Sequence, residues 1–592
     1  MASRPPAMPG KSRPNNSISV IKNTHRVYDG SQRSGPGATT KRKKYGTGRY
    51  AGIELEPQPS DSAQDPLNWA QWKKELFFLS ICMAGSIVGV FKTLFVSVNG
   101  VLATQFSVSY TAAAAFTGVP ILAAALSGFG ATFLAQMWGK RSIYLVSALL
   151  MLGASLVNMN IEQNYAAFMV TRILQGLGWG TFETLLTVSI RDIFFVHERN
   201  LRMNLYSLVV IASFWGAPIL GGFISQSKGG FSDQIMYLNL GQTVSILLLI
   251  LATPETSFDR PSPSSISTTS SHSRSQTSTS ITTTVSTNAL PTTSPSKRYL
   301  KSLHPMPYIQ IFDKAEAINA IKALIAPSTI LILLLTMPLV ATSVAVAQSL
   351  ALLFSGNPIF LFPTGLGYLF VIPAVLAVLG YTFIWLVSRH AEQPSSSSSS
   401  SSSSQVQFSL SHALSFAGAG IMIGITGLLS FGIYAASNIV SEAIDLGGEI
   451  YLTTPGADIS LSVVSLLFGM LVAGATMLEF AGVGYISSQV PDSSPSSTAL
   501  PLAYQTLQNI FIGGFILAMP SWIGDGSELR NTVLAITIVQ ILLGGTVAAI
   551  YWVKRESIVA VDARLLGLDG KKAPYSKDLK RWDTQNSFME DA

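Results

Sequence analysis

The sequence predicts an all-α membrane protein with twelve transmembrane helices in two pseudo-symmetric six-helix bundles. Its composition is the first indication: of 592 residues, 48% are hydrophobic and only 12% are charged. Soluble globular proteins carry about 25% charged residues. The 48 glycines agree, because glycine is commoner in transmembrane helices than in soluble ones. These observations exclude a set of soluble domains and a largely disordered chain.

Apolar runs along the chain locate the helices. A helix that crosses the bilayer core needs about 20 mostly apolar residues. Twelve runs meet this requirement, at 76–98, 110–137, 142–159, 165–190, 203–225, 234–253, 328–353, 365–388, 411–436, 458–487, 499–522 and 531–553. Many are apolar all round, as helices embedded in lipid are.

The distribution of Lys and Arg predicts the orientation. With twelve spans, 34 of the 38 basic residues fall on the face that carries both termini, and only Lys228 and Arg530 fall on the other. The remaining two, Lys92 and Arg172, lie inside spans. Basic residues gather on the cytosolic side of a membrane. We therefore expect both termini and the long central loop to be cytosolic, and binding to nucleic acid is not needed to explain the net charge of +7.

Polar segments divide the chain into five parts. They are a disordered basic tail at 1–75, a bundle at 76–253, a Ser/Thr-rich cytosolic linker at 254–327, a second bundle at 328–553 with a poly-Ser cytosolic loop at 389–410, and a cytosolic tail at 554–592. The polar tracts bury too little apolar surface to fold. We expect them to be linkers, with phosphorylation sites as the alternative.

Six helices, a linker and six more helices are typical of a transporter built from two repeats, with its site at their interface. The sequence has no phosphate-binding loop for an ATP-driven pump. It also has no nucleophile–base–metal constellation, and its one cysteine, Cys82, excludes an internal disulfide and a Cys-based zinc site. We expect a protein that is not an enzyme and holds neither cofactor nor metal.

Several motifs resemble the major facilitator superfamily, in particular its fungal drug/proton-antiporter-like branch. Residues 65–69 resemble its DPxNW element, and residues 134–141 resemble its cytosolic gate motif, which includes Gly139, Lys140 and Arg141. Gln136 stands where the general form of that motif has Asp. Lys140 and Arg141 can equally be simple cytosolic-side anchors of the third span.

Two glycine-containing motifs and the end of the sixth span extend this resemblance. Residues 172–180 are similar to an RxxxGxGxG element, residues 217–222 to the antiporter motif GPxxGG with Ala217 in place of its first glycine, and residues 254–256 to a PET ending. In the second half only the helix pattern matches. The resemblance implies two halves that rock to expose a central cavity alternately to each side, usually with proton coupling.

These motifs also have a physical interpretation. Gly176 and Gly180 share one helix face, where small residues let helices approach closely. Pro218 removes a backbone donor and can bend the fifth span, and Gly221 and Gly222 leave room beside it. Simple packing and a bend that rearranges during transport both fit.

Four charges inside spans are the main candidate site residues: Lys92, Arg172, Glu183 and Glu479. A charge at a helix centre costs about 2.5–3.5 kcal/mol on insertion scales, so each one is a functional hypothesis. The resemblance implies that spans one, four, seven and ten line the cavity, and all four charges fall on those spans.

The depths of these charges suggest separate roles. Lys92 and Arg172 lie about 9–10 Å from the outer ends of their spans, whereas Glu183 and Glu479 lie in the inner half. Our hypothesis is that Glu183, with Glu479, takes and releases a coupling proton, while Arg172 biases its ionisation and helps to sense substrate. The alternatives are snorkelling of Lys92 to the headgroups, pairing of Arg172 with helix-end carbonyls or a carboxylate, and a Glu479 side chain that reaches the cytosolic interface.

Uncharged polar residues supply the remaining candidates. Gln348 on span seven, and Gln505, Gln508 and Asn509 on span eleven, can bind polar groups of a substrate or bridge helices. For the span-eleven residues we expect bridging.

The sequence therefore predicts a monomeric multi-pass transporter of the plasma membrane that exports small organic compounds, such as drugs or secondary metabolites, in exchange for protons. One alternative is a proton-coupled importer of a nutrient or organic cation on the same fold. A second, of another class, is a membrane sensor that moves no solute and signals through its cytosolic segments.

Overall fold

In the computed structural model, residues 45–592 belong to one compact unit. The structure describes residues 44–46, 55–62, 64–225, 230–258, 314–356, 359–391, 410–439, 443–445, 450–452, 459–489, 498–524 and 528–567. Most of the predicted N-terminal tail and Ser/Thr-rich linker, the poly-Ser loop and the end of the C-terminal tail lie outside the described residues.

Helices α1 to α7 form the first group of six spans, here called the N half. Its elements are η2 (Pro66–Asn68), α1 (Gln71–Thr93), η3 (Leu94–Val98), α2 (Asn99–Gln105), α3 (Tyr110–Trp138), α4 (Lys140–Asn158), α5 (Tyr165–Ile193), α6 (Val196–Ile224) and α7 (Phe231–Ala252). Ser109 and Asn164 cap α3 and α5, because their side chains accept backbone N–H groups of the first turn.

Helices α10 to α16 form the second group, the C half. Its elements are α10 (Pro327–Phe354), α11 (Pro363–Tyr368), α12 (Val371–Ala391), α13 (Leu410–Ile439), α14 (Leu461–Ser488), α15 (Ala499–Ile523) and α16 (Leu529–Leu565). Strands β1 (Ala443–Asp445) and β2 (Ile450–Leu452) pair antiparallel between α13 and α14, with Ile444 opposite Tyr451. The broken helix α11–α12 forms one span.

The predicted all-α membrane fold is confirmed. In the described part of the chain, eleven helices are long and apolar enough to cross a membrane, and each coincides with a predicted span. The remaining predicted span is α5, which has 29 residues but carries Arg172 and Glu183. It packs against α3, α4 and α1, so its polar residues face protein.

The structure extends three segments beyond their predicted limits. The first span continues through η3 and α2 to Gln105, because the polar Asn99 that ends the apolar run is itself buried. Helix α9 (Lys314–Leu324) lies in the predicted linker. Its 11 residues are too few for a span, so a search for long apolar runs does not find it. Helix α16 passes through a break at Lys554 into the predicted tail.

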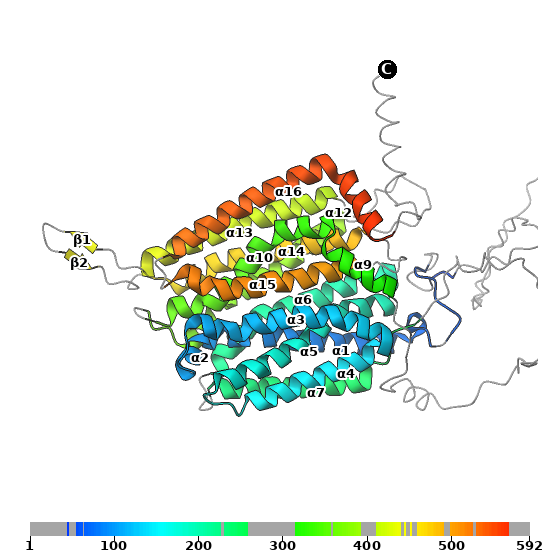
Figure 1. Ribbon diagram of the computed structural model, residues 1–592, viewed down its shortest axis with the longest axis horizontal. Coiled ribbons are helices and arrows are strands. Elements are labelled where there is room, and N and C mark those ends of the chain that lie inside the picture. The colour runs from blue at the N-terminus through cyan, green and yellow to red at the C-terminus, as the bar shows by residue number, and fades with distance from the viewer. Residues whose placement is uncertain are drawn as a thin grey trace, which may run out of the picture. The chain divides into compact units, whose positions relative to one another are not determined.

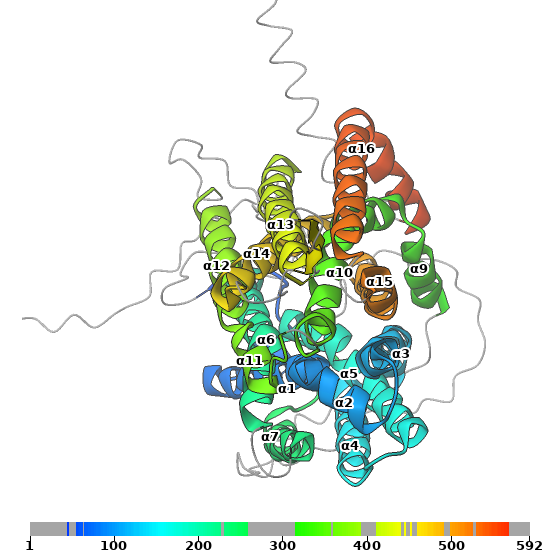
Figure 2. The same ribbon diagram turned by 90° about the vertical axis from the view of Figure 1, so that its left-hand side faces the viewer.

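Both halves run between two ends of the helix bundle (Figure 1). At the end here called the linker end, α1, α4, α6 and α10 begin and α3, α5 and α7 end. The two halves pack along α3 and α15, and along α6 with α11 and α12. Figure 2 shows the helices end on, with α3 beside α15. The central helices α1, α5, α10 and α14 lie between these two contacts.

Candidate functional site

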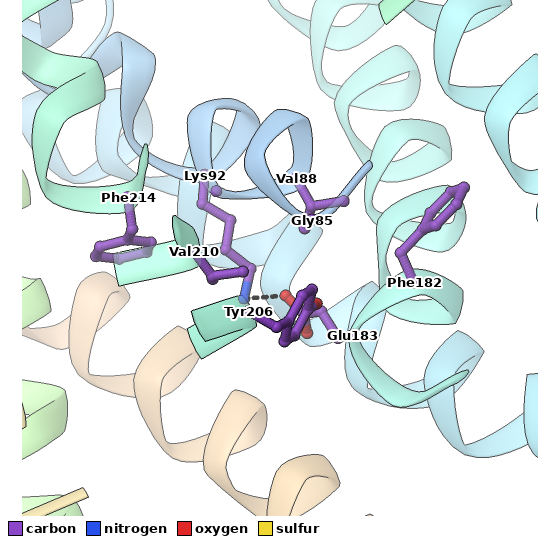
Figure 3. A pocket seen from close by; sticks show the side chains of 9 residues that line it. Gly85, Val88, Lys92, Phe182, Glu183, Tyr206, Val210 and Phe214 are labelled. Carbon is purple, nitrogen blue, oxygen red and sulfur yellow. Dashed lines mark ion pairs between the residues drawn. The ribbon is translucent and has the colours of Figure 1, made fainter. Parts of the chain in front are cut away.

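A largely buried ion pair joins the first and fourth spans. The Lys92 ammonium, in the last turn of α1, pairs with Oε1 of Glu183 on α5 (Figure 3). The two side chains are only 12% and 11% exposed. Because α1 continues into η3 and α2, Lys92 lies well inside the span rather than close to its outer end. The structure therefore brings together two charges that the sequence analysis placed at different depths.

Glu183 is also held from the other half of the molecule. Its second oxygen, Oε2, accepts a 2.7 Å hydrogen bond from Nδ2 of Asn509 on α15. Ion pairs and charge-assisted hydrogen bonds to a carboxylate are stronger than hydrogen bonds between neutral groups. The charge on Glu183 therefore supports a contact between α5 of the N half and α15 of the C half. Asn509 bridges helices, as expected.

Glu479 on α14 has a different environment. Nε2 of Gln508, the neighbour of Asn509 on α15, donates a 2.5 Å hydrogen bond to its Oε1. Lys92 and Glu183 both interact electrostatically with Glu479, so the three charges form one cluster. No cation in the described part of the chain makes a direct ion pair with Glu479. With both carboxylates ionised, the cluster carries one net negative charge.

A small cavity borders the ion pair. It has a volume of about 70 Å³ and is lined by Gly85, Val88, Gly89, Lys92, Phe182, Glu183, Tyr206, Val210 and Phe214. Figure 3 shows Tyr206 beside the ion pair, on the side of α6. Gly85 is required here, since a Cβ at this position would lie 2.7 Å from the Tyr206 ring. The cavity has room for a few water molecules and is smaller than the roughly 300 Å³ of a pocket for a drug-sized ligand.

Arg172 does not join this cluster. Its guanidinium is 0% exposed and donates to the carbonyl oxygens of Phe116 at 2.8 Å and Phe91 at 3.3 Å, and to the side chain of Gln175 at 2.6 Å. It also lies over the rings of Phe95 and Trp179. Arg172 thereby ties α5 to α1 and α3. In the structure, Lys92 and not Arg172 is the basic partner of Glu183.

Gln348 lies in a contact between the halves, away from the linker end. Nδ2 of Asn99 on α2 donates to the Gln348 carbonyl oxygen at 3.1 Å and to its Oε1 at 3.0 Å. Nearby, the hydroxyls of Tyr110 and Ser355 are 3.1 Å apart. These contacts hold α2 and α3 against α10. Gln348 is 2% exposed, and its described bonds bridge helices.

The gate motif is built around a carboxylate from the end of the N half. Both oxygens of Glu255 accept backbone N–H groups at the start of α4, from Lys140 at 3.1 Å and Arg141 at 3.0 Å. Gly139 has a φ of +80°, and a Cβ there would lie 2.5 Å from the Glu255 carboxylate. Only glycine fits this turn without strain. Glu255 thus acts as a helix cap supplied from the segment that follows α7.

The two basic residues of the same motif have structural partners. The Lys140 ammonium pairs with Asp192 at the end of α5. The buried Arg141 guanidinium donates to carbonyl oxygens of Ile250 and Thr253 at the end of α7. The motif therefore ties together the linker ends of three helices of the N half.

The motif glycines lie at close helix contacts. A Cβ on Gly176 would collide with the carbonyl of Pro120, and one on Gly180 with the carbonyl of Ala124, so α5 packs directly on the backbone of α3. Gly221 packs in the same way on η3. Gly222 contacts the C half, where a Cβ would lie 2.5 Å from the carbonyl oxygen of Pro363 on α11. Pro218 lies in the same contact, because its carbonyl oxygen faces Gly367.

Sequence reasoning missed three residues that contact the predicted candidates in different parts of the structure. Asn99 and Tyr206 carry no charge and stand in no recognised motif, so no pattern distinguishes them. Glu255 stands in the PET ending, but its role depends on a turn 115 residues away.

The sequence matches the family model described as Major Facilitator Superfamily over residues 78–359. It is 26% identical to the uncharacterized MFS-type transporter C1271.10c of Schizosaccharomyces pombe over 213 residues, which is 35% of this chain and 36% of that protein. It is 34% identical to the MFS antiporter QDR3 of Candida albicans over 121 residues, 20% of this chain and 17% of that protein.

A further relative is the Polyamine transporter 4 of Saccharomyces cerevisiae, 27% identical over 210 residues, 34% of this chain and 30% of that protein. The aligned part of the chain thus spans about a third or less of the length of these relatives.

Proposed function

We propose that this chain, a member of the major facilitator superfamily that resembles its fungal drug-antiporter-like branch, is a secondary active transporter that works by alternating access. In our proposal it exports small organic compounds in exchange for protons. The observation that carries the proposal is the position of Glu183, which pairs with Lys92 in the N half and accepts a hydrogen bond from Asn509 in the C half.

This position offers a way to couple proton binding to movement. When Glu183 is ionised, Lys92 and Asn509 both stabilise it, and its charge links the two halves. Protonation removes the charge, which weakens both interactions. Because α5 and α15 belong to different halves, the protonation state of Glu183 then biases how closely they pack. A ligand with different affinities for two conformations shifts their equilibrium, and here the proton is that ligand.

The charges around the cavity favour a cationic substrate. Arg172 is bound to backbone carbonyls and Gln175, so it does not neutralise the cluster of Lys92, Glu183 and Glu479. That cluster has one carboxylate more than it has cations. The similarity to a relative named as a polyamine transporter supports the same class. A proton-coupled importer of an organic cation is the second candidate, because the charges of the cluster favour neither export nor import.

The proposal also includes the membrane, the orientation and the oligomeric state of the protein. We place this multi-pass chain in the plasma membrane as a monomer, with the linker end and both termini in the cytosol. The bias of 34 basic residues to 2 between the two faces supports this orientation.

The function is tested with purified protein in proteoliposomes, using labelled organic cations, neutral compounds and anions, with and without a pH gradient. The proposal predicts counterflow of organic cations and accumulation driven by a proton gradient of opposite direction. Accumulation driven by a gradient of the same direction would instead establish the importer. If no probe crosses in either direction while the protein binds it, the chain is a sensor rather than a transporter.

A further inference from the structure

Helix α9 separates its residues into two faces. One face consists of alanines, Ala317, Ala320 and Ala323, all less than 9% exposed. It packs against α15 and α16 of the C half. Small side chains allow this close contact, and Figure 2 shows α9 outside α15.

The other face of α9 is apolar and uncovered. Ile318, Ile321 and Ile325 are 50%, 56% and 65% exposed. Ile318 and Ile321 are spaced at i and i+3, so they lie on one side of the helix, and Ile325 follows in the turn directly after the last residue of α9. Exposing three neighbouring isoleucine side chains to water is unfavourable in free energy. Among the described residues nothing covers these isoleucine side chains, and contact with an apolar environment would stabilise them.

The polar and charged residues of α9 are also divided between its two faces. Lys314 and Lys322 are exposed and lie four residues before and after Ile318, on its side of the helix. Glu316 and Asn319 instead face inward, where they line a small cavity with Gln136 of α3 and Thr498 at the start of α15. The outward face therefore combines isoleucines with positive charge only.

Exposed apolar residues also lie on neighbouring helices at the same end of the bundle. At the linker end of α3, Leu134 and Trp138 are 40% and 44% exposed, and on α16 Trp552 is 86% exposed. Tryptophan at the end of a membrane span lies at the level of the headgroups. Helix α9 lies at the same end of the bundle, close to both α3 and α16.

We propose that α9 is an interfacial helix that inserts Ile318, Ile321 and Ile325 below the headgroups and binds anionic phospholipid through Lys314 and Lys322. A helix with an apolar face and flanking lysines lies in the plane of the interface. Lysine stems extend along apolar surface while their ammonium groups reach the phosphates. The anionic lipid of the membrane leaflet attracts the basic residues. The partner is thus the charged surface of the bilayer itself.

Spin labels on the full-length chain test this proposal. In a Cys82→Ala background, the variants Ile318→Cys and Ile321→Cys are labelled separately and reconstituted in nanodiscs. Collision with oxygen, which concentrates in lipid, is compared with collision with a water-soluble nickel reagent. Leu126→Cys, 72% exposed in the middle of α3, is the lipid reference. Glu162→Cys, exposed between α4 and α5, is the aqueous reference.

The proposal predicts that labels at 318 and 321 collide mainly with oxygen, as the label at 126 does. In nanodiscs of phosphatidylcholine mixed with phosphatidylserine, both labels should lie deeper than in phosphatidylcholine alone. That shift should disappear when Lys314→Gln and Lys322→Gln are added. Collision mainly with the nickel reagent would overturn the proposal, and protection from both reagents would show a protein partner instead. Equal depth in the two lipid compositions would overturn the assignment to anionic headgroups.

Discussion

Arg172, which is buried, and Glu183, which is largely buried, are two charges on α5 about 16 Å apart along the helix axis, and they are held in different ways. Arg172 donates to two backbone carbonyls and to a glutamine of its own helix. Glu183 is held by side chains from two other helices, one in each half. Backbone partners stay with their helix, whereas side-chain partners can separate. The bonds of Arg172 suit a residue that fixes the fold of the N half, and those of Glu183 are the reason that we propose it as the proton-exchanging group.

The largest effect is expected at Glu183. The change Glu183→Gln leaves the buried Lys92 without its carboxylate, which should lower the free energy of unfolding by about 3–5 kcal/mol. It should also abolish transport driven by a pH gradient, because the side chain no longer takes up a proton. Thermal unfolding and flux into proteoliposomes measure the two effects.

A double variant separates these two consequences. Lys92→Met with Glu183→Gln removes both charges, and we expect stability to return while the response to the pH gradient stays absent. A single Glu183→Gln variant that is as stable as the parent chain and still driven by the gradient would contradict the assignment.

The variant Arg172→Lys tests whether Arg172 acts on stability alone. Lysine keeps the charge but cannot reproduce the planar set of donors that reaches two carbonyls and Gln175. Loss of charge-assisted hydrogen bonds should destabilise the chain by about 1.5–3 kcal/mol. The protein that remains folded should keep its response to the pH gradient. Loss of that response at unchanged stability would place Arg172 in the coupling mechanism.

Gly180, which lies on α5 between the two charges, tests the packing that positions them. Gly180→Ala places a methyl group against the backbone of Ala124, and overpacking of this kind costs about 1–3 kcal/mol. Gly153→Ala on α4 is the matched control, since a Cβ there has no neighbour within 4 Å. Unfolding temperatures that fall equally in both variants would show that the α3–α5 contact is not specific.

The smallest effect on stability is expected at Glu479. Glu479→Gln keeps an acceptor for Gln508 but removes a carboxylate that makes no ion pair with a cation among the described residues. We predict about tenfold weaker binding of organic cations, equivalent to ~1.4 kcal/mol, with little change in binding of neutral compounds. Glu528→Gln, exposed at the start of α16, is the control. Unchanged cation affinity would exclude Glu479 from substrate selection.

Much of this arrangement can be predicted from the sequence, because its causes are local. Apolar length identifies the spans, and the spacing of Gly176 and Gly180 identifies the face of α5 that packs on α3. The depth of Lys92 could not be predicted, because the polar Asn99 marks the end of an apolar run although it is buried against Gln348. The bond between Asn509 and Glu183 joins residues 326 positions apart. It depends on how α5 and α15 are aligned, and no local pattern encodes that alignment.

The central claim is that Glu183 exchanges a proton when substrate binds. The direct measurement is proton release from the purified protein in weakly buffered solution, at a pH low enough for Glu183 to be protonated beforehand, on addition of a transported organic cation. The account predicts release by the parent chain and by Arg172→Lys, and none by Glu183→Gln. Equal release from Glu183→Gln and the parent chain would contradict it, because the proton would then come from another group.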